Sequence, residues 1–258
     1  MPFRRAINAA IGKIRRAPLV NNVVKWVQSA FPPSICFVSA TRLPEADFWA
    51  GSPLGTTLKP LLGKQVTYLI RYENTDGLPA LYNQAITERK SDILVFVHDD
   101  VWLDDPQLLK KMVDGLNHFD VIGVAGNRRI SKRQPAWLFS QIVYGKFIRD
   151  TEYLSGSVIH GEPPENTNKV TFGEMPAPCE LLDGVLLAGW RAPLLRARVH
   201  FDNTFKFDFY DMDFCRSARQ AHLTLGTWPI DIIHRSRGKF GTERWQESYE
   251  AYLAKWKQ

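Results

Sequence analysis

The chain has 258 residues, of which 45% are hydrophobic and 23% charged, a composition ordinary for a globular protein with a sizeable core. Its three cysteines, Cys36, Cys179 and Cys215, are far apart and odd in number, which disfavours a disulfide framework or a zinc site and fits a reducing cytosol. No apolar run reaches the roughly 18 residues of a membrane-spanning helix. No continuous apolar segment resembles a secretory signal.

The net charge of +6 comes from the N-terminus. Six of the 33 basic residues and none of the acidic ones lie in residues 1–30, so the remainder holds 27 basic and 27 acidic residues. A nucleic-acid-binding protein usually spreads basic charge over its binding face, so we expect no nucleic acid partner. Residues 1–33 are predicted to form a basic amphipathic helical arm. Such an arm can contact an anionic membrane surface, pack on the protein's own body or mediate self-association, and the sequence leaves these roles open.

From residue 34 onward, apolar runs alternate with helical patterns. We expect strands at 35–40, 66–70, 93–97 and 121–125, a loop with a short helix at 44–62, and helices at 78–88 and 106–116. This alternation predicts an α/β domain with a mostly parallel central sheet flanked by helices. The runs are continuously apolar, as expected for strands that are covered on both faces. Ligands of such sheets bind beyond the carboxyl ends of the strands.

The second half of the chain is less regular. Residues 130–178 are rich in Pro, Gly, Asn and charge and lack periodicity, so we expect a functional loop or lid there. A broken strand is predicted over 181–188, a helix over 210–222, a strand over 230–234 and an amphipathic helix over 244–256. The helix over 210–222 opens with acidic residues, which suit the helix dipole.

Two adjacent carboxylates, Asp99 and Asp100, follow His98 where the third apolar run ends. They repel each other unless a cation neutralises them. A divalent metal that bridges phosphate groups is the most economical partner, because Mg²⁺ or Mn²⁺ is held by one or two carboxylates, phosphate oxygens and water. The alternative is a solvated turn. Asp104 and Asp105 are instead expected to start the next helix, with Asp105 as its N-cap.

Four motifs together carry a family resemblance: VFVHDDV, LLDGVLLA, FDFYDMDFCRSARQAHL and IIHRSRG. In this order and spacing, residues 34–240 resemble a nucleotide-sugar-dependent glycosyltransferase of the GT-A fold, family 2, in a bacterial subgroup with HDD in place of DxD. The resemblance implies one Rossmann-like domain over 34–258 after the arm. Its expected parts are a nucleotide-binding half at 34–129, a variable loop or acceptor region at 130–178, an acceptor and catalytic half at 179–240 and a C-terminal helix at 241–258.

The resemblance also implies a donor site for a nucleoside-diphosphate sugar of UDP, dTDP or GDP. Asp100 would bind the Mn²⁺ or Mg²⁺ that bridges the diphosphate, with Asp99 on the ribose or supporting the metal. His98 departs from the family pattern and could hydrogen-bond the nucleotide or fill space. Histidine suits Mn²⁺, so His234 is a second metal or diphosphate contact. The other implied donor contacts are Thr41, Arg42, Asn74, Asp76, Asp183 and Gly184. Asn74 and Asp76 both remain open as readers of the base.

Asp211 aligns in this resemblance with the general base of an inverting transfer. The base takes the acceptor hydroxyl proton while the oxygen attacks C1 from the face opposite the leaving diphosphate. Tyr210 replaces the family's usual Glu, and Asp213 remains a rival base. We expect the acceptor to be a growing surface glycan or a lipid-linked glycan. The expected location is cytoplasmic, or peripheral on the inner face of the cell membrane.

Two other functions stay open from the sequence. One is a metal-dependent phosphohydrolase, although His-Asp pairs of that class normally sit on helices with further histidines nearby. The other is a non-catalytic module that binds a nucleotide sugar or a glycan, which the departures at His98 and Tyr210 would favour. Aromatic residues that can stack on sugars or pack internally are Trp137, Tyr144 and Trp190; cations that can neutralise a diphosphate are Arg235, Arg237 and Lys239.

Overall fold

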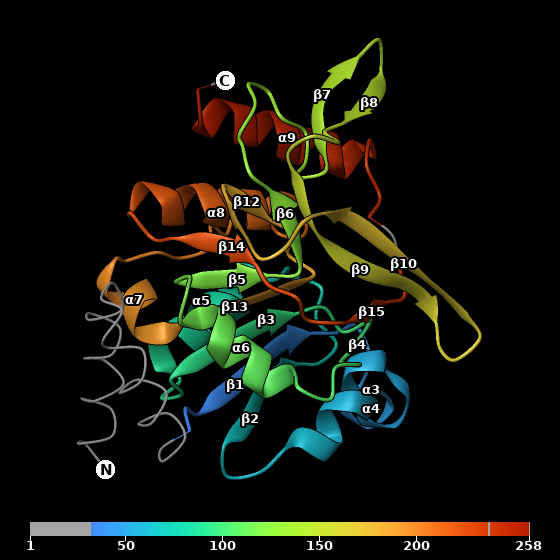
Figure 1. The fold of residues 1–258 in the computed structure, drawn as a ribbon, viewed down its shortest axis with the longest axis vertical. Helices are drawn as coiled ribbons and strands as arrows, with labels where there is room; N and C mark the ends of the chain where they lie inside the picture. Colours follow the sequence, from blue (N-terminus) through green and yellow to red (C-terminus); the bar gives the residue numbers. More distant parts are fainter. Residues whose placement is uncertain (1–31, 237, 258) are drawn as a thin grey trace.

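The structure, a computed structural model, describes residues 32–236 and 238–257. Nearly all of the predicted arm of residues 1–33 therefore lies outside the described residues, as does Arg237. None of the helices in the described ranges combines the length and the apolar character needed to cross a membrane. In Figure 1 the larger sheet lies low in the view, and the C-terminal helix and two hairpins lie above and beside it.

The central sheet has seven strands in the order β11-β14-β5-β13-β3-β1-β2. Five of them, β2, β1, β3, β5 and β14, run in one direction, while β13 and β11 run in the opposite one. The predicted α/β class with a mostly parallel central sheet is therefore confirmed. The strands are β1 (Ile35–Ala40), β2 (Val66–Arg71), β3 (Ile93–Val97), β5 (Val121–Gly123), β11 (Ala177–Cys179), β13 (Leu186–Trp190) and β14 (Leu225–Thr227).

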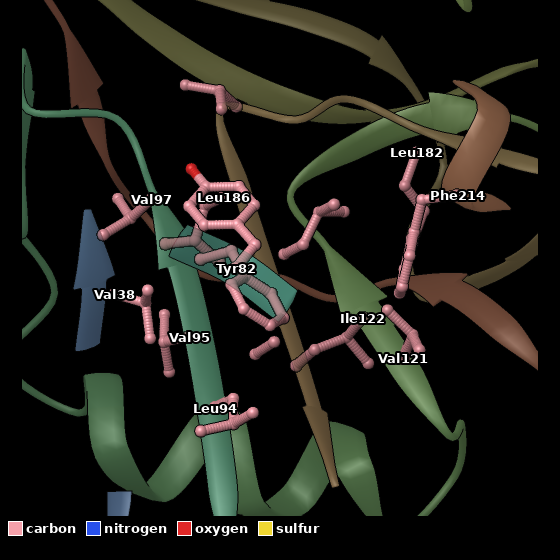
Figure 2. Close-up of a cluster of buried hydrophobic side chains, with 14 of the residues drawn as sticks. Val38, Tyr82, Leu94, Val95, Val97, Val121, Ile122, Leu182, Leu186 and Phe214 are labelled. Carbon is pink, nitrogen blue, oxygen red and sulfur yellow. The ribbon is translucent and has the colours of Figure 1, made fainter. Parts of the chain in front are cut away.

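Helices cover this sheet, as its apolar strands require. Every residue of β1, β3 and β13 is buried. Helix α5 (Pro79–Glu88) packs on β1 and β3, α6 (Leu108–Leu116) packs on β5 and β13, and α7 (Arg191–Arg196) packs on β13. Figure 2 shows part of the resulting core, with Val38, Tyr82, Val95 and Leu186 among its buried side chains. The expected helices at 78–88 and 106–116 are thus present.

A second sheet lies beside the central one and is built mainly from the second half of the chain. Its order is β12-β6-β9-β15-β4, with β10 paired to β9, and a separate hairpin joins β7 to β8. These strands are β4 (Val101–Trp102), β6 (Ala125–Asn127), β7 (Phe139–Val143), β8 (Lys146–Arg149), β9 (Leu154–Glu162), β10 (Asn166–Gly173), β12 (Leu181–Leu182) and β15 (Ile233–His234). In Figure 1 the β9–β10 hairpin projects away from the central sheet.

The expectation of a loop or lid without regular elements at 130–178 was wrong. This region forms the β7–β8 hairpin, the β9–β10 hairpin and β11. Strand β10 is largely exposed, so its residues are polar and show no apolar run. Its order comes from antiparallel pairing with β9, which a local pattern does not display.

Two predicted strands are divided where the chain passes from one sheet to the other. The run 121–125 becomes β5 and β6 with Val124 between them, and 181–188 becomes β12 and β13. The two breaks face each other, because β6 pairs with β12 and β5 with β13. The amide of Asp183 donates to the carbonyl of Ala125 at 2.9 Å. Asp183, Gly184 and Val185 thus form a short irregular segment between β12 and β13, at the centre of the fold.

The remaining helices agree with the sequence expectations for 44–62, 210–222 and 244–256. They are α3 (Glu45–Gly51), α4 (Pro53–Leu58), the 3₁₀ turn η1 (Lys59–Leu61), α8 (Tyr210–Gln220) and α9 (Glu243–Lys255). Trp245 and Tyr249 of α9 stack on each other, and Tyr249 stacks on Phe209, which immediately precedes α8. This aromatic contact fastens the C-terminal helix beside the start of α8.

Asp105 is a buried structural carboxylate, although it is not the N-cap of α6, which is Gln107. Its Oδ1 accepts from the amide of Gln107 at 2.9 Å. Its Oδ2 accepts from Lys111 Nζ at 2.6 Å and from the amide of Asp231 at 3.1 Å. Asp105 thus ties α6 to the segment that leads into β15. Its neighbour Asp104 is exposed.

We expect Asp105→Asn to lower the free energy of unfolding by about 2 kcal/mol, because an amide cannot satisfy three buried donors. Burial alone would raise the pKa of Asp105, but the hydrogen bonds from Lys111, Asp231 and Gln107 outweigh it and hold the pKa below the ordinary 3.8. A lowered folded-state pKa means that this stabilisation is present above pH 3.8 and is lost as the pH falls through the folded value. Urea unfolding at pH 7 and at low pH measures the loss and its disappearance. Asp104→Asn is the control, and an equal loss in both variants would contradict the assignment.

Candidate functional site

The carboxyl ends of β1, β2 and β3 meet at one edge of the central sheet, and predicted donor residues lie there. The amide of Thr41 donates to Arg71 O at 2.9 Å, and the amide of Asn74 donates to Thr41 O at 2.8 Å. The Thr41 hydroxyl is also a hydrogen-bond partner of Asp99. Thr41, Asn74 and Asp99 are thereby brought together. Arg42 is exposed beside them.

Asn74 and Asp76 differ sharply in their surroundings. Asn74 is 5% exposed, and its Nδ2 donates to Gly77 O at 3.1 Å. Its Oδ1 is buried without a hydrogen-bond partner among the described residues, an uncommon and costly state. Asp76 is exposed. Asn74 thus carries an unsatisfied acceptor that the protein covers, whereas Asp76 is open to solvent, and which of the two reads a nucleotide base stays a prediction.

Three side chains, His98, Asp100 and His234, form a candidate metal centre whose ligand atoms all lie within 4.8 Å of one another. His98 and Asp100 occupy the turn between β3 and β4, and His234 ends β15. Strands β4 and β15 pair antiparallel with His234 opposite Val101. This pairing places His234 Nε2 at 3.2 Å from Asp100 Oδ1.

The charges at this centre suit a divalent cation. Burial raises the pKa of Asp100, but contacts with His234 and His98 outweigh it and hold the pKa well below its usual range. Burial and the neighbouring His234 lower the pKa of His98 to about 4, so its ring is neutral with a lone pair available. Burial acts to lower the pKa of His234, but Asp100 overcomes it and the net shift is upward. Two imidazoles and a carboxylate, completed by phosphate oxygens, fit Mn²⁺ better than Mg²⁺, which prefers oxygen ligands.

Asp211 lies in the first turn of α8, beside the segment between β12 and β13 that contains Asp183 and Gly184. Its Oδ2 accepts from the amide of Gly184 at 3.0 Å, and its Oδ1 accepts from the amide of Met212 at 2.8 Å. Burial and then the nearby Asp183 raise the pKa of Asp211 to about 7. Burial likewise raises the pKa of Asp183. A carboxylate whose pKa is near neutrality is suited to accept a proton.

Asp213 has a different environment from Asp211. It is fully buried, and its Oδ1 and Oδ2 lie 2.7 and 2.9 Å from Lys255 Nζ. Trp256 Nε1 also donates to Oδ1 at 3.0 Å. The structure therefore directs Asp213 toward the C-terminal helix and its end, while Asp211 faces Gly184.

Tyr210 is the site residue whose contacts the sequence did not reveal. Its hydroxyl lies 2.8 Å from His98 Nε2 and donates to Gly184 O at 3.1 Å. The two residues that depart from the family pattern, His98 and Tyr210, are thus in direct contact. The sequence signal for this contact is that both residues differ from the family pattern. They are 112 residues apart in the chain, so no local pattern links them.

A pocket of about 530 Å³ begins at this site. His98, His234, Asp183 and Asp211 line one end of it. Thr41, Asn74 and Asp99 are not among its lining residues, so the pocket extends away from the nucleotide edge. Aromatic side chains form much of its wall, namely Trp137, Phe172, Phe207, Phe209, Phe240 and Trp245.

Only one of the three predicted stacking residues lines this pocket. Trp137 does, whereas Trp190 is a core residue whose Nε1 donates to Leu116 O at 2.8 Å. Tyr144 is fully exposed at the turn between β7 and β8. The other wall residues come from the hairpins and from the segments flanking α8 and α9, and no sequence signal distinguishes them from core aromatics.

The cationic side chains that were predicted to neutralise a diphosphate, Arg235 and Lys239, have different surroundings. Arg235 Nε pairs with Glu162 Oε1 at 3.0 Å, and its guanidinium lies over the Trp102 ring at 5.0 Å. Lys239 lines the pocket. Of these two cations, Lys239 is the one placed beside the space a substrate would occupy.

Fold and site together define an α/β protein with a candidate divalent-cation centre at the carboxyl edge of its sheet. The family model described as "Glycosyltransferase like family" matches residues 64–249, well over half of the chain. The protein therefore belongs to the glycosyltransferase like family. The match agrees with the predicted resemblance and with the GT-A fold class, while the HDD subgroup stays a prediction.

A comparison with curated proteins finds no match. Among solved structures, the chain is similar to GalNAc-T7 crystallised with UDP, GalNAc and Mn²⁺, at 11% identity over 86% of this chain and 48% of that one, with a TM-score of 0.48. It is similar to the mannosyltransferase PcManGT from Pyrobaculum calidifontis in complex with GDP-Man and Mn²⁺, at 11% identity over 95% and 71%, with a TM-score of 0.46. It is also similar to S. aureus TarS, at 11% identity over 79% and 37%, with a TM-score of 0.42. The chain thus spans about half of the first of these proteins.

We expect Mn²⁺ to raise the melting temperature more at pH 8 than at pH 5.5. The folded-state pKa of Asp211 is raised from 3.8 to about 7, so the unliganded protein loses stability as the pH rises across that interval. A bound cation offsets this loss, and its binding is favoured once protons have left the site. Differential scanning fluorimetry at constant ionic strength measures the two shifts. Asp100→Ala is the control and should abolish both, whereas an equal or smaller shift at pH 8 would contradict the assignment.

Proposed function

We propose that this protein is a metal-dependent inverting glycosyltransferase of the hexosyltransferase type. It moves a sugar from a nucleoside-diphosphate sugar to a hydroxyl of a glycan or lipid-linked glycan in surface polysaccharide biosynthesis. Family membership supports the transfer reaction in general. One observation carries the finer proposal: the partly buried carboxyl of Asp211 and the histidines of the candidate metal centre, His98 and His234, line the same end of one pocket.

In this proposal His98, Asp100 and His234 hold Mn²⁺, with Mg²⁺ as the weaker fit. When bound, the cation supplies positive charge to the departing diphosphate. Thr41, Arg42, Asn74, Asp76 and Asp99 form the nucleotide edge, where UDP, dTDP or GDP binds. The free Oδ1 of Asn74 accepts a hydrogen bond from a base N–H.

Asp211 is the general base of the proposed reaction. The acceptor oxygen forms a bond to C1 of the donor sugar, the bond from C1 to the diphosphate oxygen breaks, and the hydroxyl proton passes to Asp211. The amides of Gly184 and Met212 fix the carboxylate in place. Its raised pKa makes it a stronger base than an ordinary aspartate. Asp213 suits this role less well, because it is fully buried, is paired with Lys255 and is not among the residues that line the pocket.

The pocket supports a glycan acceptor. It leads away from Asp211 between aromatic side chains, and aromatic faces stack on the apolar faces of sugar rings. Lys239 is placed to attract an anionic group of the acceptor or the diphosphate. We place the reaction in the cytoplasm or at the inner face of the cell membrane, with residues 1–30 as the proposed membrane or self-association contact.

The two alternatives fit the site less well. A dinuclear phosphohydrolase needs ligands for a pair of metal ions, whereas the described ranges contain one three-residue cluster. A purely binding module does not require a carboxyl whose pKa is raised to about 7 at the head of a pocket.

Thermal-shift screening of UDP, GDP, dTDP and CDP, each with and without Mn²⁺, tests the donor class. A nucleotide that binds only the folded state raises the melting temperature. We expect one nucleotide to do so in a Mn²⁺-dependent manner, and release of the same nucleoside diphosphate from its sugar donors then identifies the sugar. The proposal fails if no nucleotide stabilises the protein with Mn²⁺ present. Tight nucleotide binding without turnover of any donor would indicate the binding module instead.

Asp211→Asn should lower the transfer rate by about 10²- to 10⁴-fold, because an amide cannot take the proton from the hydroxyl of the sugar acceptor. Its nucleotide affinity should stay close to that of the wild type. Asp213→Asn is the matched variant one half-turn along α8. It should cost about 2 kcal/mol of stability through Lys255 and Trp256 while the folded fraction keeps its transfer rate. Steady-state kinetics and urea unfolding separate the two effects, and the reverse pattern would make Asp213 the base.

Phe172→Ala should weaken glycan binding by about tenfold through loss of a stacking face, with nucleotide affinity unchanged. Phe172 lines the pocket and packs edge-on against Trp137, with ring centroids 5.0 Å apart. A glycan array probed in the presence of Mn²⁺ and the stabilising nucleotide identifies the ligand and measures the loss. Tyr144→Ala removes an aromatic ring that is fully exposed outside the pocket and serves as the control. Equal losses of glycan binding in both variants would contradict the proposal that the glycan acceptor binds in this pocket.

A further inference from the structure

His98, which is partly buried, and Tyr210, which is buried, form a pair at the head of the pocket. Their Nε2 and hydroxyl oxygen lie 2.8 Å apart. Tyr210 is 3% exposed, and its ring packs against Tyr82 and Phe201, with centroid separations of 6.0 and 6.2 Å. The hydroxyl therefore has a fixed position rather than a choice of partners in solvent.

The hydrogen bonds around this hydroxyl determine which nitrogen of His98 carries the proton. A tyrosine hydroxyl has one proton to donate, and a carbonyl oxygen can only accept, so both contacts are hydrogen bonds only if that proton goes to Gly184 O at 3.1 Å. The contact with His98 then requires Nε2–H as the donor. A neutral imidazole has a single N–H, so its lone pair is left on Nδ1.

Gly184 is the residue that permits this arrangement. A Cβ at Gly184 would overlap the Tyr210 hydroxyl and would press on Asp211. Any other residue at this position would displace the tyrosine. The backbone of Gly184 also serves both halves of the site, since its carbonyl receives the Tyr210 hydroxyl and its amide holds Asp211.

We propose that Tyr210 is a positioning residue that holds His98 as the Nε2–H tautomer, so that Nδ1 is presented to the divalent cation. The inference rests on the proposed function in one respect, namely that His98, Asp100 and His234 bind that cation. Partners of metal-ligating histidines commonly fix the tautomer and ring orientation in this way. The opposite arrangement, in which the cation uses Nε2 and the hydroxyl competes with it, is an outcome of the test.

Tyr210→Phe removes the hydroxyl and keeps the ring that packs against Tyr82 and Phe201. We expect the affinity of the full-length protein for Mn²⁺ alone, measured by isothermal titration calorimetry, to fall by about 10- to 100-fold. Tyr82→Phe is the matched control. It is also a buried tyrosine beside the same site, but its hydroxyl has no hydrogen-bond partner among the described residues. Its Mn²⁺ affinity should equal that of the wild type.

The tautomer itself is read without metal from ¹⁵N chemical shifts of the histidine rings, with the His98 signals assigned by their loss in His98→Gln. The wild type and Tyr82→Phe should show a protonated Nε2 and a bare Nδ1, and Tyr210→Phe should show a mixture. A merely structural role for Tyr210 would change stability without changing these shifts.

The outcomes separate this inference from the proposed function. If the wild type binds Mn²⁺ and Tyr210→Phe binds it equally or more tightly, the positioning role is overturned while the transferase proposal stands. If His98 keeps the same tautomer without the hydroxyl, the positioning role is likewise overturned. If the wild type binds no Mn²⁺ with or without UDP or GDP, the metal-dependent mechanism fails and the inference fails with it.

Discussion

The site depends on one electrostatic constraint, the burial of carboxylates without basic partners. Three aspartates with little exposed surface have lysine or arginine beside them: Asp105 has Lys111, Asp150 has Arg129, and Asp213 has Lys255. No lysine or arginine ion pair joins Asp99, Asp183 or Asp211 within the described ranges, and the partner of Asp100 there is a histidine. Burial raises the pKa of Asp99, Asp183 and Asp211. The fold therefore leaves a concentration of negative charge that a divalent cation can balance.

The exchange of strands between the two sheets creates the space in which these acids meet. Where β5 gives way to β6 and β12 to β13, the strands are interrupted, and Asp183 and Gly184 lie at the interruption beside Asp211. The hairpins and α9 then surround the opening with aromatic side chains. Charge at one end and apolar rings along the wall give the pocket a direction, from the carboxylates and histidines toward the aromatic side chains.

The sequence predicts the parts of this arrangement that local pattern controls. The continuous apolar runs identify β1, β2 and β3, and the acids that end β3 mark the site because such charges are unusual after a buried strand. The β9–β10 hairpin was missed because its exposed strand is polar. The different environments of Asp211 and Asp213, two residues apart on α8, depend on Gly184 and Lys255, which are distant in the chain. The contact of Tyr210 with His98 is of the same kind: it exists only once the tertiary structure has formed.

The pairing of β4 with β15 makes the candidate metal centre a property of the nearly complete chain. Asp100 and His234 are 134 residues apart in sequence, and a two-residue strand brings them together. During synthesis, a chain interrupted before β15 carries the nucleotide edge but lacks one metal ligand and the C-terminal helix that packs beside α8. Premature termination would therefore yield a fragment able to form part of the nucleotide edge but without a complete ligand set for the cation.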